Sequence, residues 1–262
     1  MDHEMILTET RGRVGIIVFN RPDKLNALHP AMSSEMRRQI EAWNSDPGIG
    51  AIVLTGAGRS FCSGADVGGW NQRIKQREEG REPERKGDGS WVTFAMESKP
   101  LICAINGPAI GAGLTITLPC DVRIASDQAR LSMRFIRMGI FPELASTHLL
   151  AHIVGMGHAM ELMLSGKIID AEEAARIGLV NRVVPHAKLL DEAVDAAAKI
   201  AFNPAEHVME VKRVAWQNLD EGDIPTVQRR EGAALAAAVA SPAFKEAVRA
   251  FLEKRQPDFH RK

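Results

Sequence analysis

Two short stretches of small residues have the composition needed to hold a negatively charged oxygen. They are residues 60–66 (SFCSGAD) and 105–115 (INGPAIGAGLT), and each follows a short apolar run. Small residues let a ligand approach the backbone closely, and unpaired amides at the start of a helix favour anions. Two such turns could give two N–H donors to one oxygen, which is an oxyanion hole. The residues alone leave open the alternative that these glycines only close loops.

Three other groupings that could carry chemistry lack a necessary part. Residues 56–58 (GAG) follow a predicted strand, but a dinucleotide fingerprint would need a third glycine where this chain has Phe61. Cys62 adjoins the first turn, and with no evident activating histidine we predict a core or spacer role. His148 and His152 lie four residues apart on a predicted helix, yet the sequence shows no third ligand, so we predict no metal site.

Several motifs in the same order resemble those of the crotonase superfamily, the enoyl-CoA hydratases and isomerases. Besides the two small-residue turns, they are residues 20–28 (NRPDKLNAL), 120–125 (CDVRIA), 171–185 (AEEAARIGLVNRVVP) and 250–255 (AFLEKR). The resemblance covers nearly the whole chain. It implies an α/β fold, a crotonase-type spiral of ββα units with a helical C-terminal trimerisation region. It further implies an acyl-CoA substrate, no separate cofactor, and a homotrimer or a hexamer made of two trimers.

The resemblance also implies roles for particular residues, carried over by motif position. The backbone N–H groups of Ala65 and Ala112 would hold the thioester oxygen. Four neighbours would frame these two donors: Gly64, Asp66, Gly111 and Gly113. Lys24 and Leu25 would lie near the adenine and phosphates of CoA, and Phe251 and Lys254 would contact CoA, often from a neighbouring subunit.

The chain departs from the family pattern where the well-known hydratases carry two glutamates. Those positions hold Thr115 and Phe135 here, which argues against hydration by a two-glutamate water site. Glu143, directly after the proline of a GIFPE turn, is the one nearby acid. A single carboxylate suits a 1,3-proton shift, and an apolar setting from Ile140, Phe141 and Leu144 would raise its pKa toward neutrality. The alternative is an exposed glutamate that opens the next helix.

Three functions therefore remain open. The first is double-bond isomerisation or an atypical hydration of an enoyl-CoA, with Glu143 as the acid/base. The second is thioester hydrolysis or another acyl-CoA conversion, in which Glu143 activates water. The third is a catalytically weak acyl-CoA-binding homologue, suggested by the missing glutamates.

The elements that must position these residues alternate in the first half of the chain. Apolar runs at residues 14–19, 51–55, 101–105 and 122–125 predict strands, and helical spacing at residues 31–43 predicts a helix. From about residue 144 the pattern is mostly helical, with one further strand predicted at 179–184. We predict a core over residues 1–200 and a helical region over residues 201–262.

The composition is that of an ordinary globular protein and excludes some partners. Lys plus Arg equals Asp plus Glu, at 33 each, so no basic excess points to nucleic acid. No apolar run reaches the length of a membrane span, and three cysteines without paired spacing fit a reducing compartment. We therefore predict a soluble, cytoplasmic protein. The densely charged residues 73–88 predict a solvated surface segment or a lid beside the site.

Overall fold

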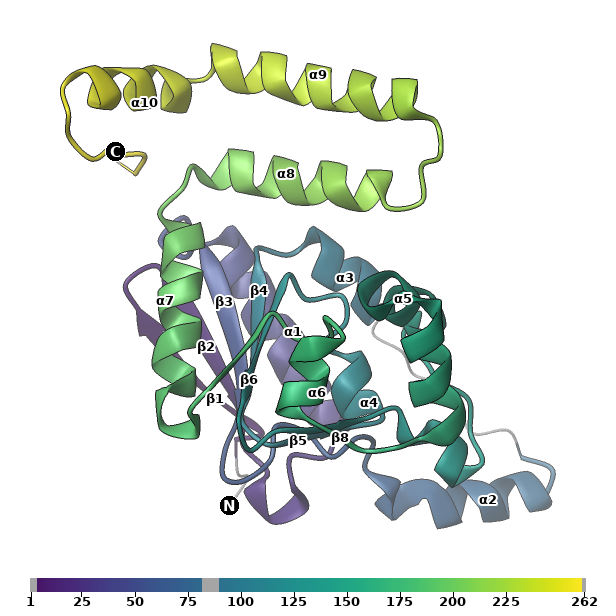
Figure 1. Cartoon of the computed structure of the whole chain (residues 1–262). Helices are drawn as coiled ribbons and strands as arrows, with labels where there is room; N and C mark the ends of the chain where they lie inside the picture. Colours follow the sequence, from purple (N-terminus) through teal and green to yellow (C-terminus); the bar gives the residue numbers. More distant parts are fainter. Residues whose placement is uncertain (1–3, 82–89, 261–262) are drawn as a thin grey trace.

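The computed structural model describes residues 4–81 and 90–260, and its centre is a six-stranded sheet (Figure 1). In spatial order the strands are β1 (Ile6–Arg11), β2 (Val14–Phe19), β3 (Ala51–Gly56), β4 (Leu101–Ile105), β6 (Val122–Ser126) and β9 (Arg182–Val184). β1 pairs antiparallel with β2, and every other pair is parallel. Parallel neighbours need crossover connections, so the predicted α/β class is confirmed.

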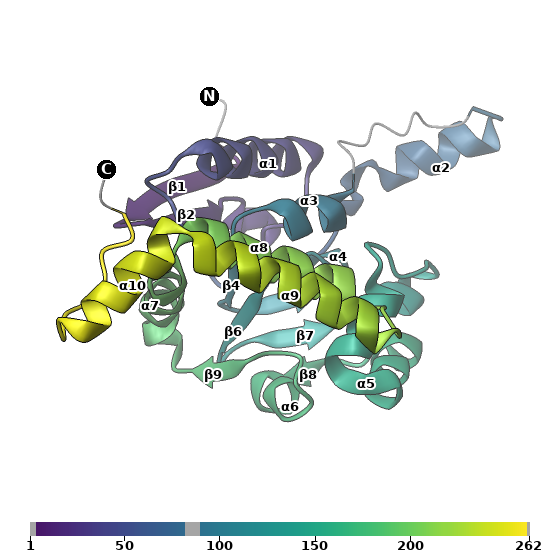
Figure 2. The ribbon, with the colours of Figure 1, turned by 90° about the horizontal axis from the view of Figure 1, so that it is seen from above.

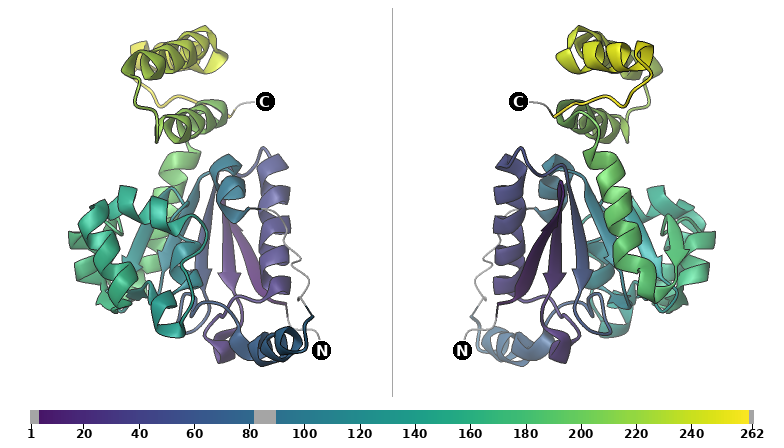
Figure 3. Two further views of the ribbon diagram at one scale, coloured as in Figure 1. Left: turned by 90° about the vertical axis from the view of Figure 1, so that its right-hand side faces the viewer. Right: turned by 90° about the vertical axis from the view of Figure 1, so that its left-hand side faces the viewer.

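Helices cover both faces of this sheet, and alternate residues of each strand supply the two cores. Ile16, Val53 and Ile102 pack against α7 (Leu189–Ala201). Ile17 and Leu54 point to the other face, which α1 (Pro30–Ser45) helps to cover. Figure 3 shows the sheet between these two helices. Burial on both faces explains why the central strands are continuous apolar runs.

A second, three-stranded sheet lies where the small-residue turns are. It consists of β5 (Pro108–Ile110), β7 (Arg130–Ser132) and β8 (Ile169–Asp170), and β5 leads into the short helix α4 (Ala112–Thr115). The sequence did not predict these three strands, nor β1. Strands of two or three residues carry too little pattern to be recognised, and β1 buries only Ile6.

The rest of the core is helical. Its helices are α2 (Trp70–Glu78), α3 (Trp91–Glu97), α5 (Ser146–Ser165) and α6 (Ala171–Arg176). Asp170 caps the start of α6, because its carboxylate accepts from the Glu173 N–H at 2.8 Å. The charged segment 73–88 begins inside α2, whereas residues 82–88 lie outside the described residues.

Three helices follow the core: α8 (Ala205–Asn218), α9 (Ile224–Ala240) and α10 (Pro242–Leu252). Figure 1 and Figure 2 show α8 lying over one end of the core, with α9 and α10 beyond it. α7 ends at Ala201, and we keep the division into residues 1–200 and 201–262 as a proposal. None of the described helices has both the length and the apolar character needed to cross a bilayer. The cytoplasmic location stays a prediction.

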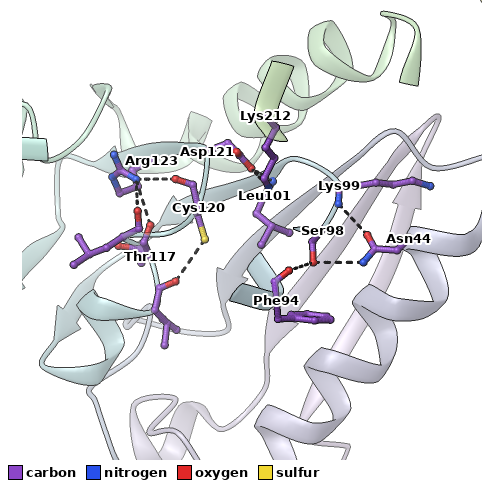
Figure 4. A network of polar contacts seen from close by, with 12 residues as sticks. Asn44, Phe94, Ser98, Lys99, Leu101, Thr117, Cys120, Asp121, Arg123 and Lys212 are labelled. Carbon is purple, nitrogen blue, oxygen red and sulfur yellow. Dashed lines mark hydrogen bonds and ion pairs between the residues drawn. The ribbon is translucent and has the colours of Figure 1, made fainter. Parts of the chain in front are cut away.

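α8 is fixed to the core by an ion pair (Figure 4). The Lys212 ammonium lies 2.7 Å from a carboxylate oxygen of Asp121, and that oxygen also accepts from the Leu101 N–H at 2.8 Å. The Lys212 side chain is only 5% exposed. Arg123 also holds this loop by donating to the carbonyls of Cys120 and Leu179, each at 2.8 Å. The helical region is therefore joined to the core through residues 120–123.

We expect Lys212→Met to lower the free energy of unfolding by about 3 kcal/mol, because it leaves the Asp121 carboxylate without its counter-ion. Chemical denaturation followed by far-UV circular dichroism measures this loss. Lys245→Met, at an exposed position on α10, is the matched control and should change stability little. Equal stability of the two variants would contradict the anchoring role of the ion pair.

Candidate active site

The first small-residue turn is held by the loop that follows β2. The Ser63 N–H donates to the Leu25 carbonyl at 3.0 Å, and the Leu28 N–H donates to the Gly64 carbonyl at 2.7 Å. The Asp66 N–H in turn donates to the Leu28 carbonyl at 3.0 Å. Residues 63–66 are therefore paired almost like a strand, which fixes the direction of the Ala65 N–H between them.

Asn26 makes this supporting loop rigid. It is fully buried and has a left-handed backbone, with φ of 56°. Its side-chain amide donates to the carbonyls of Ala57 and Ser60, at 2.9 and 2.7 Å, and its oxygen accepts from the Arg21 N–H at 2.9 Å. Asparagine tolerates the left-handed region better than other residues that carry a Cβ, so this residue suits both requirements.

An ion pair between Arg21 and Asp66 joins the loop after β2 to the end of the first turn. The Arg21 guanidinium lies 2.8 Å from the Asp66 carboxylate and also donates to the Ala27 carbonyl at 2.7 Å. The hydrogen bond from Arg21 holds the pKa of Asp66 below its usual value, and the Gly68 N–H that donates to this carboxylate adds to the effect. The resemblance implied a framing role for Asp66 but did not identify Arg21, because 45 residues separate the partners and no local signal joins them.

The second turn places a free amide at the start of α4. Gly111 has φ of 55° and donates its N–H to the Ser132 carbonyl at 2.8 Å, which joins the turn to β7. The Gly111 carbonyl then accepts from the N–H groups of Leu114 and Thr115. Ala112 is the first residue of α4, so its N–H has no acceptor within the helix.

The two turns are in direct contact. The Cys62 N–H donates to the Pro108 carbonyl, and the Ile110 N–H donates to the Cys62 carbonyl, both at 3.0 Å. A Cβ on Gly113 would lie 2.1 Å from the Cys62 oxygen, and a Cβ on Gly64 would lie 2.8 Å from the Ile110 oxygen. Both positions therefore require glycine, because any side chain would push the turns apart.

The contact leaves two backbone donors available between the turns. Within residues 4–81 and 90–260, neither the Ala65 N–H nor the Ala112 N–H donates to a protein acceptor. A Cβ placed on Gly64, next to Ala65, would lie 3.8 Å from the Ala112 nitrogen, so the two amides belong to adjoining stretches of chain. An oxyanion hole needs two such free donors, and the role of Ala65 and Ala112 in binding an oxygen stays a prediction.

Thr115 and Phe135, at the positions that hold glutamates in the well-known hydratases, are both buried. Thr115 is fully buried, and its hydroxyl donates to the Ala112 carbonyl at 3.3 Å. Phe135 is 5% exposed, and its ring lies about 4.0 Å from where a Gly111 Cβ would be. Neither side chain offers a carboxylate to the site.

Glu143 lies on the turn before α5, and the backbone of this turn is strained. Leu144 and Ala145 both have left-handed conformations, with φ of 56° and 53°. Two consecutive residues with a Cβ in this region cost free energy, which is typical of functional turns. The Glu143 residue is exposed in the single chain, yet partial burial of its carboxyl raises the pKa above its usual value. Its carboxylate has no side-chain partner among the described residues.

The apolar setting predicted for Glu143 is only partly present. Phe141 is 79% exposed and Ile140 is 38% exposed, so the prediction that both enclose the carboxylate is wrong for the single chain. Leu144 alone of the three packs against the main core. The reason is local: the chain turns outward after Gly139, whose φ is 65°, before it enters α5.

The residues predicted to bind CoA fall into two groups. Lys24 and Leu25 adjoin the first turn, because the Lys24 carbonyl accepts from the Ser63 hydroxyl at 3.4 Å. Phe251 lies on α10 and is 83% exposed, and Lys254 follows that helix. α10 lies at the opposite end of the molecule from α2 and β5 (Figure 1), so one chain does not bring this second group to the site.

Cys62 is fully buried, as predicted for a spacer. Burial raises the pKa of its thiol to about 12, so the thiolate is not available at neutral pH. The residue's part in the site is its backbone, which joins the two turns.

The fold is α/β, and the pair of turns leaves the N–H groups of Ala65 and Ala112 without a protein acceptor among the described residues. The chain belongs to the enoyl-CoA hydratase/isomerase family, whose model matches residues 9–262. It is 35% identical to the short-chain-enoyl-CoA hydratase of Clostridium acetobutylicum, covering 98% of this chain and 97% of that protein. It is 33% identical to the crotonyl-CoA hydratase of Syntrophomonas wolfei, with 99% of both chains covered.

The fold comparison agrees with the sequence comparison. The crystal structure of an enoyl-CoA hydratase from Bacillus anthracis superposes with a TM-score of 0.85 at 30% identity, covering 98% of this chain and 99% of that one. The crotonase-type fold with C-terminal helices is therefore confirmed. The chain is an enzyme of the hydratase/isomerase type that acts on an acyl-CoA.

Proposed function

We propose that this enzyme moves the double bond of a 3-enoyl-CoA to the 2-position, with Glu143 as its single acid and base. In this mechanism the N–H groups of Ala65 and Ala112 bind the thioester oxygen. The observation that supports the proposal is which carboxylates are present: Glu143 is there, whereas Thr115 and Phe135 occupy the positions of the two glutamates that hydratases use.

The proposed steps conserve every atom of the substrate. The ionised Glu143 carboxylate removes a proton from C2, and the electron pair moves through the carbonyl to give an enolate. Two N–H donors hold the charge on the enolate oxygen, where one such donor is worth about 2.7–4 kcal/mol of barrier. The neutral Glu143 then returns the proton to C4, and the double bond forms between C2 and C3. No water is consumed.

Atypical hydration is the second candidate. Two relatives with more than 30% identity carry hydratase names, which favours it. In that reaction Glu143 alone would orient and deprotonate water for attack on C3 of a 2-enoyl-CoA. The buried Thr115 hydroxyl is bonded to the Ala112 carbonyl, so it does not replace a catalytic carboxylate.

One substrate panel separates the candidates. The protein is incubated with a 3-enoyl-CoA, a 2-enoyl-CoA and a saturated acyl-CoA, and products are followed by mass and chromatography. A shifted double bond without mass change supports isomerisation. Gain of one water by an intact thioester shows hydration, and release of free CoA shows hydrolysis. Binding of all three without turnover would overturn the catalytic proposal and favour a binding homologue.

For the CoA part of the substrate, we propose that Lys24 and Leu25 of one chain act together with Phe251 and Lys254 of a neighbouring copy. Exposed apolar residues on the last helices support association into a trimer or a hexamer, since Leu235, Phe251 and Leu252 are 66%, 83% and 74% exposed. Sedimentation velocity gives the oligomeric state. Loss of CoA-ester affinity in Lys254→Ala without loss of assembly would support the shared site.

The proposed base predicts a particular pH dependence. Glu143 must be ionised to remove a proton, and burial raises its pKa, so kcat/KM should fall as the pH falls through a midpoint above the usual glutamate value. The measurement is kcat/KM for a 3-enoyl-CoA between pH 4 and 9, within limits set by stability controls. An activity that stays constant down through the usual glutamate range would contradict Glu143 as the base.

A further inference from the structure

The structure places a third potential metal ligand beside His148 and His152, which no local pattern in the sequence had indicated. Asp220, in the turn between α8 and α9, lies beside both histidines, although 68 residues separate it from the nearer one. Figure 1 and Figure 2 both show the end of α8 next to α5. One nitrogen of each imidazole and one carboxylate oxygen lie within 4.8 Å of one another. The prediction that no metal site exists here was based on the missing ligand.

The hydrogen bonding of His152 fixes which of its nitrogens faces Asp220. Its Nδ1 lies 3.1 Å from the His148 carbonyl oxygen. A carbonyl can only accept a hydrogen bond, so Nδ1 carries the proton, and Nε2 of the neutral ring carries a lone pair. That Nε2 faces an oxygen of Asp220, which is also an acceptor. Two facing acceptors repel each other unless a proton on Nε2 or a metal ion lies between them. A backbone partner on the other ring nitrogen is also what metal-bound histidines usually have.

The separations fit a shared metal ion better than a shared proton. The Asp220 oxygen lies 3.4 Å from Nε2 of His148 and 3.5 Å from Nε2 of His152. A charge-assisted N–H···O bond would be shorter, about 2.7–2.9 Å. Ligand bonds of about 2.0–2.1 Å at tetrahedral angles place neighbouring ligand atoms about 3.3 Å apart. The two imidazole rings lie side by side, with centroids 4.2 Å apart, as expected for positions four residues apart on a helix.

We propose that His148, His152 and Asp220 form a binding site for one divalent transition-metal ion, with Zn²⁺ as the probe. Two imidazoles and one carboxylate suit Zn²⁺, whereas Mg²⁺ and Ca²⁺ prefer oxygen ligands alone. All three residues are exposed, so an ion can enter from solvent, and a fourth position remains for water. Bound metal would tie the first turns of α5, directly after Glu143, to the turn after α8. The site does not depend on which reaction the enzyme catalyses.

The test uses the full chain without an affinity tag, because a polyhistidine tag would itself bind zinc. After chelator treatment and its removal, Zn²⁺ is titrated by calorimetry at neutral pH. We expect one ion per chain and an upward shift of Tm with added Zn²⁺. Co²⁺ should give the visible absorption of a tetrahedral site. His148→Asn, His152→Gln and Asp220→Asn should each weaken Zn²⁺ binding about ten-fold or more.

His158→Gln is the matched control, since this exposed histidine lies on α5 outside the cluster. Its zinc affinity should equal that of the unchanged protein. The proposal is overturned if no saturable binding occurs at one equivalent, or if the three cluster variants bind zinc as tightly as the control. It is also overturned if the Tm of the unchanged protein depends on pH but does not rise with added Zn²⁺. Circular dichroism of each variant shows that the fold is retained.

Discussion

Glu143→Gln is expected to lower kcat by about 10²–10⁴-fold on the substrate that the panel identifies, while acyl-CoA binding changes little. Glutamine keeps the size and shape of the side chain but can neither remove nor return a proton. Because Glu143 has no side-chain partner among the described residues, the change breaks no ion pair. Initial rates give kcat, and calorimetry with a slowly reacting or saturated acyl-CoA gives the dissociation constant.

Glu172→Gln is the control for this experiment, because Glu172 is an exposed glutamate in the first turn of α6. It should keep full activity. If Glu143→Gln kept kcat within about two-fold of the unchanged enzyme, Glu143 would not be the acid/base. A parallel loss of binding and kcat would instead show that the turn had moved.

Ala112→Pro is expected to lower kcat/KM by at least about 10²–10³-fold, which is the usual effect of losing one oxyanion donor. Proline removes the N–H and places its ring where the substrate oxygen would bind. The substitution should be compatible with the fold, because Ala112 is the first residue of α4 and proline is well tolerated there. Gly111 before it has φ of 55° and ψ of −121°, outside the helical region that a following proline disfavours.

Ala205→Pro makes the same change at the first position of α8, where the residue is exposed and far from both turns. This control should keep activity and stability. Thermal unfolding of both variants shows whether the helices remain intact. A folded Ala112→Pro variant with full activity would rule out the Ala112 amide as a donor to the thioester oxygen.

Much of the framework could be predicted from sequence because its signals are local. The runs at residues 14–19 and 101–105 match β2 and β4 residue for residue, since strands buried on both faces are continuously apolar. The mostly helical pattern predicted from about residue 144 is also confirmed, and it includes α9, which begins after the capping residue Asp223. The strand predicted at residues 179–184 was too long, because only β9 pairs with the sheet.

The candidate site was likewise predicted only in part from the sequence. Motif resemblance located the two turns and Glu143, and the residue types showed that two family glutamates are missing. Whether Phe141 encloses Glu143 depended on the direction of the chain after Gly139, and there the prediction was wrong. The partnership of Arg21 with Asp66 joins parts of the chain that no periodicity connects.

The sequence by itself determined which backbone segments are composed of small residues and which acid stands near the positions of the two missing glutamates. Only the tertiary structure decided that Gly113 packs on the Cys62 carbonyl, so that two turns about 50 residues apart form one site. It also decided that Asp220 meets His148 and His152. The physical reason is that strand and helix patterns reflect contacts between residues close in the chain, whereas a site is formed by contacts that exist only after β4, α5 and α8 have packed.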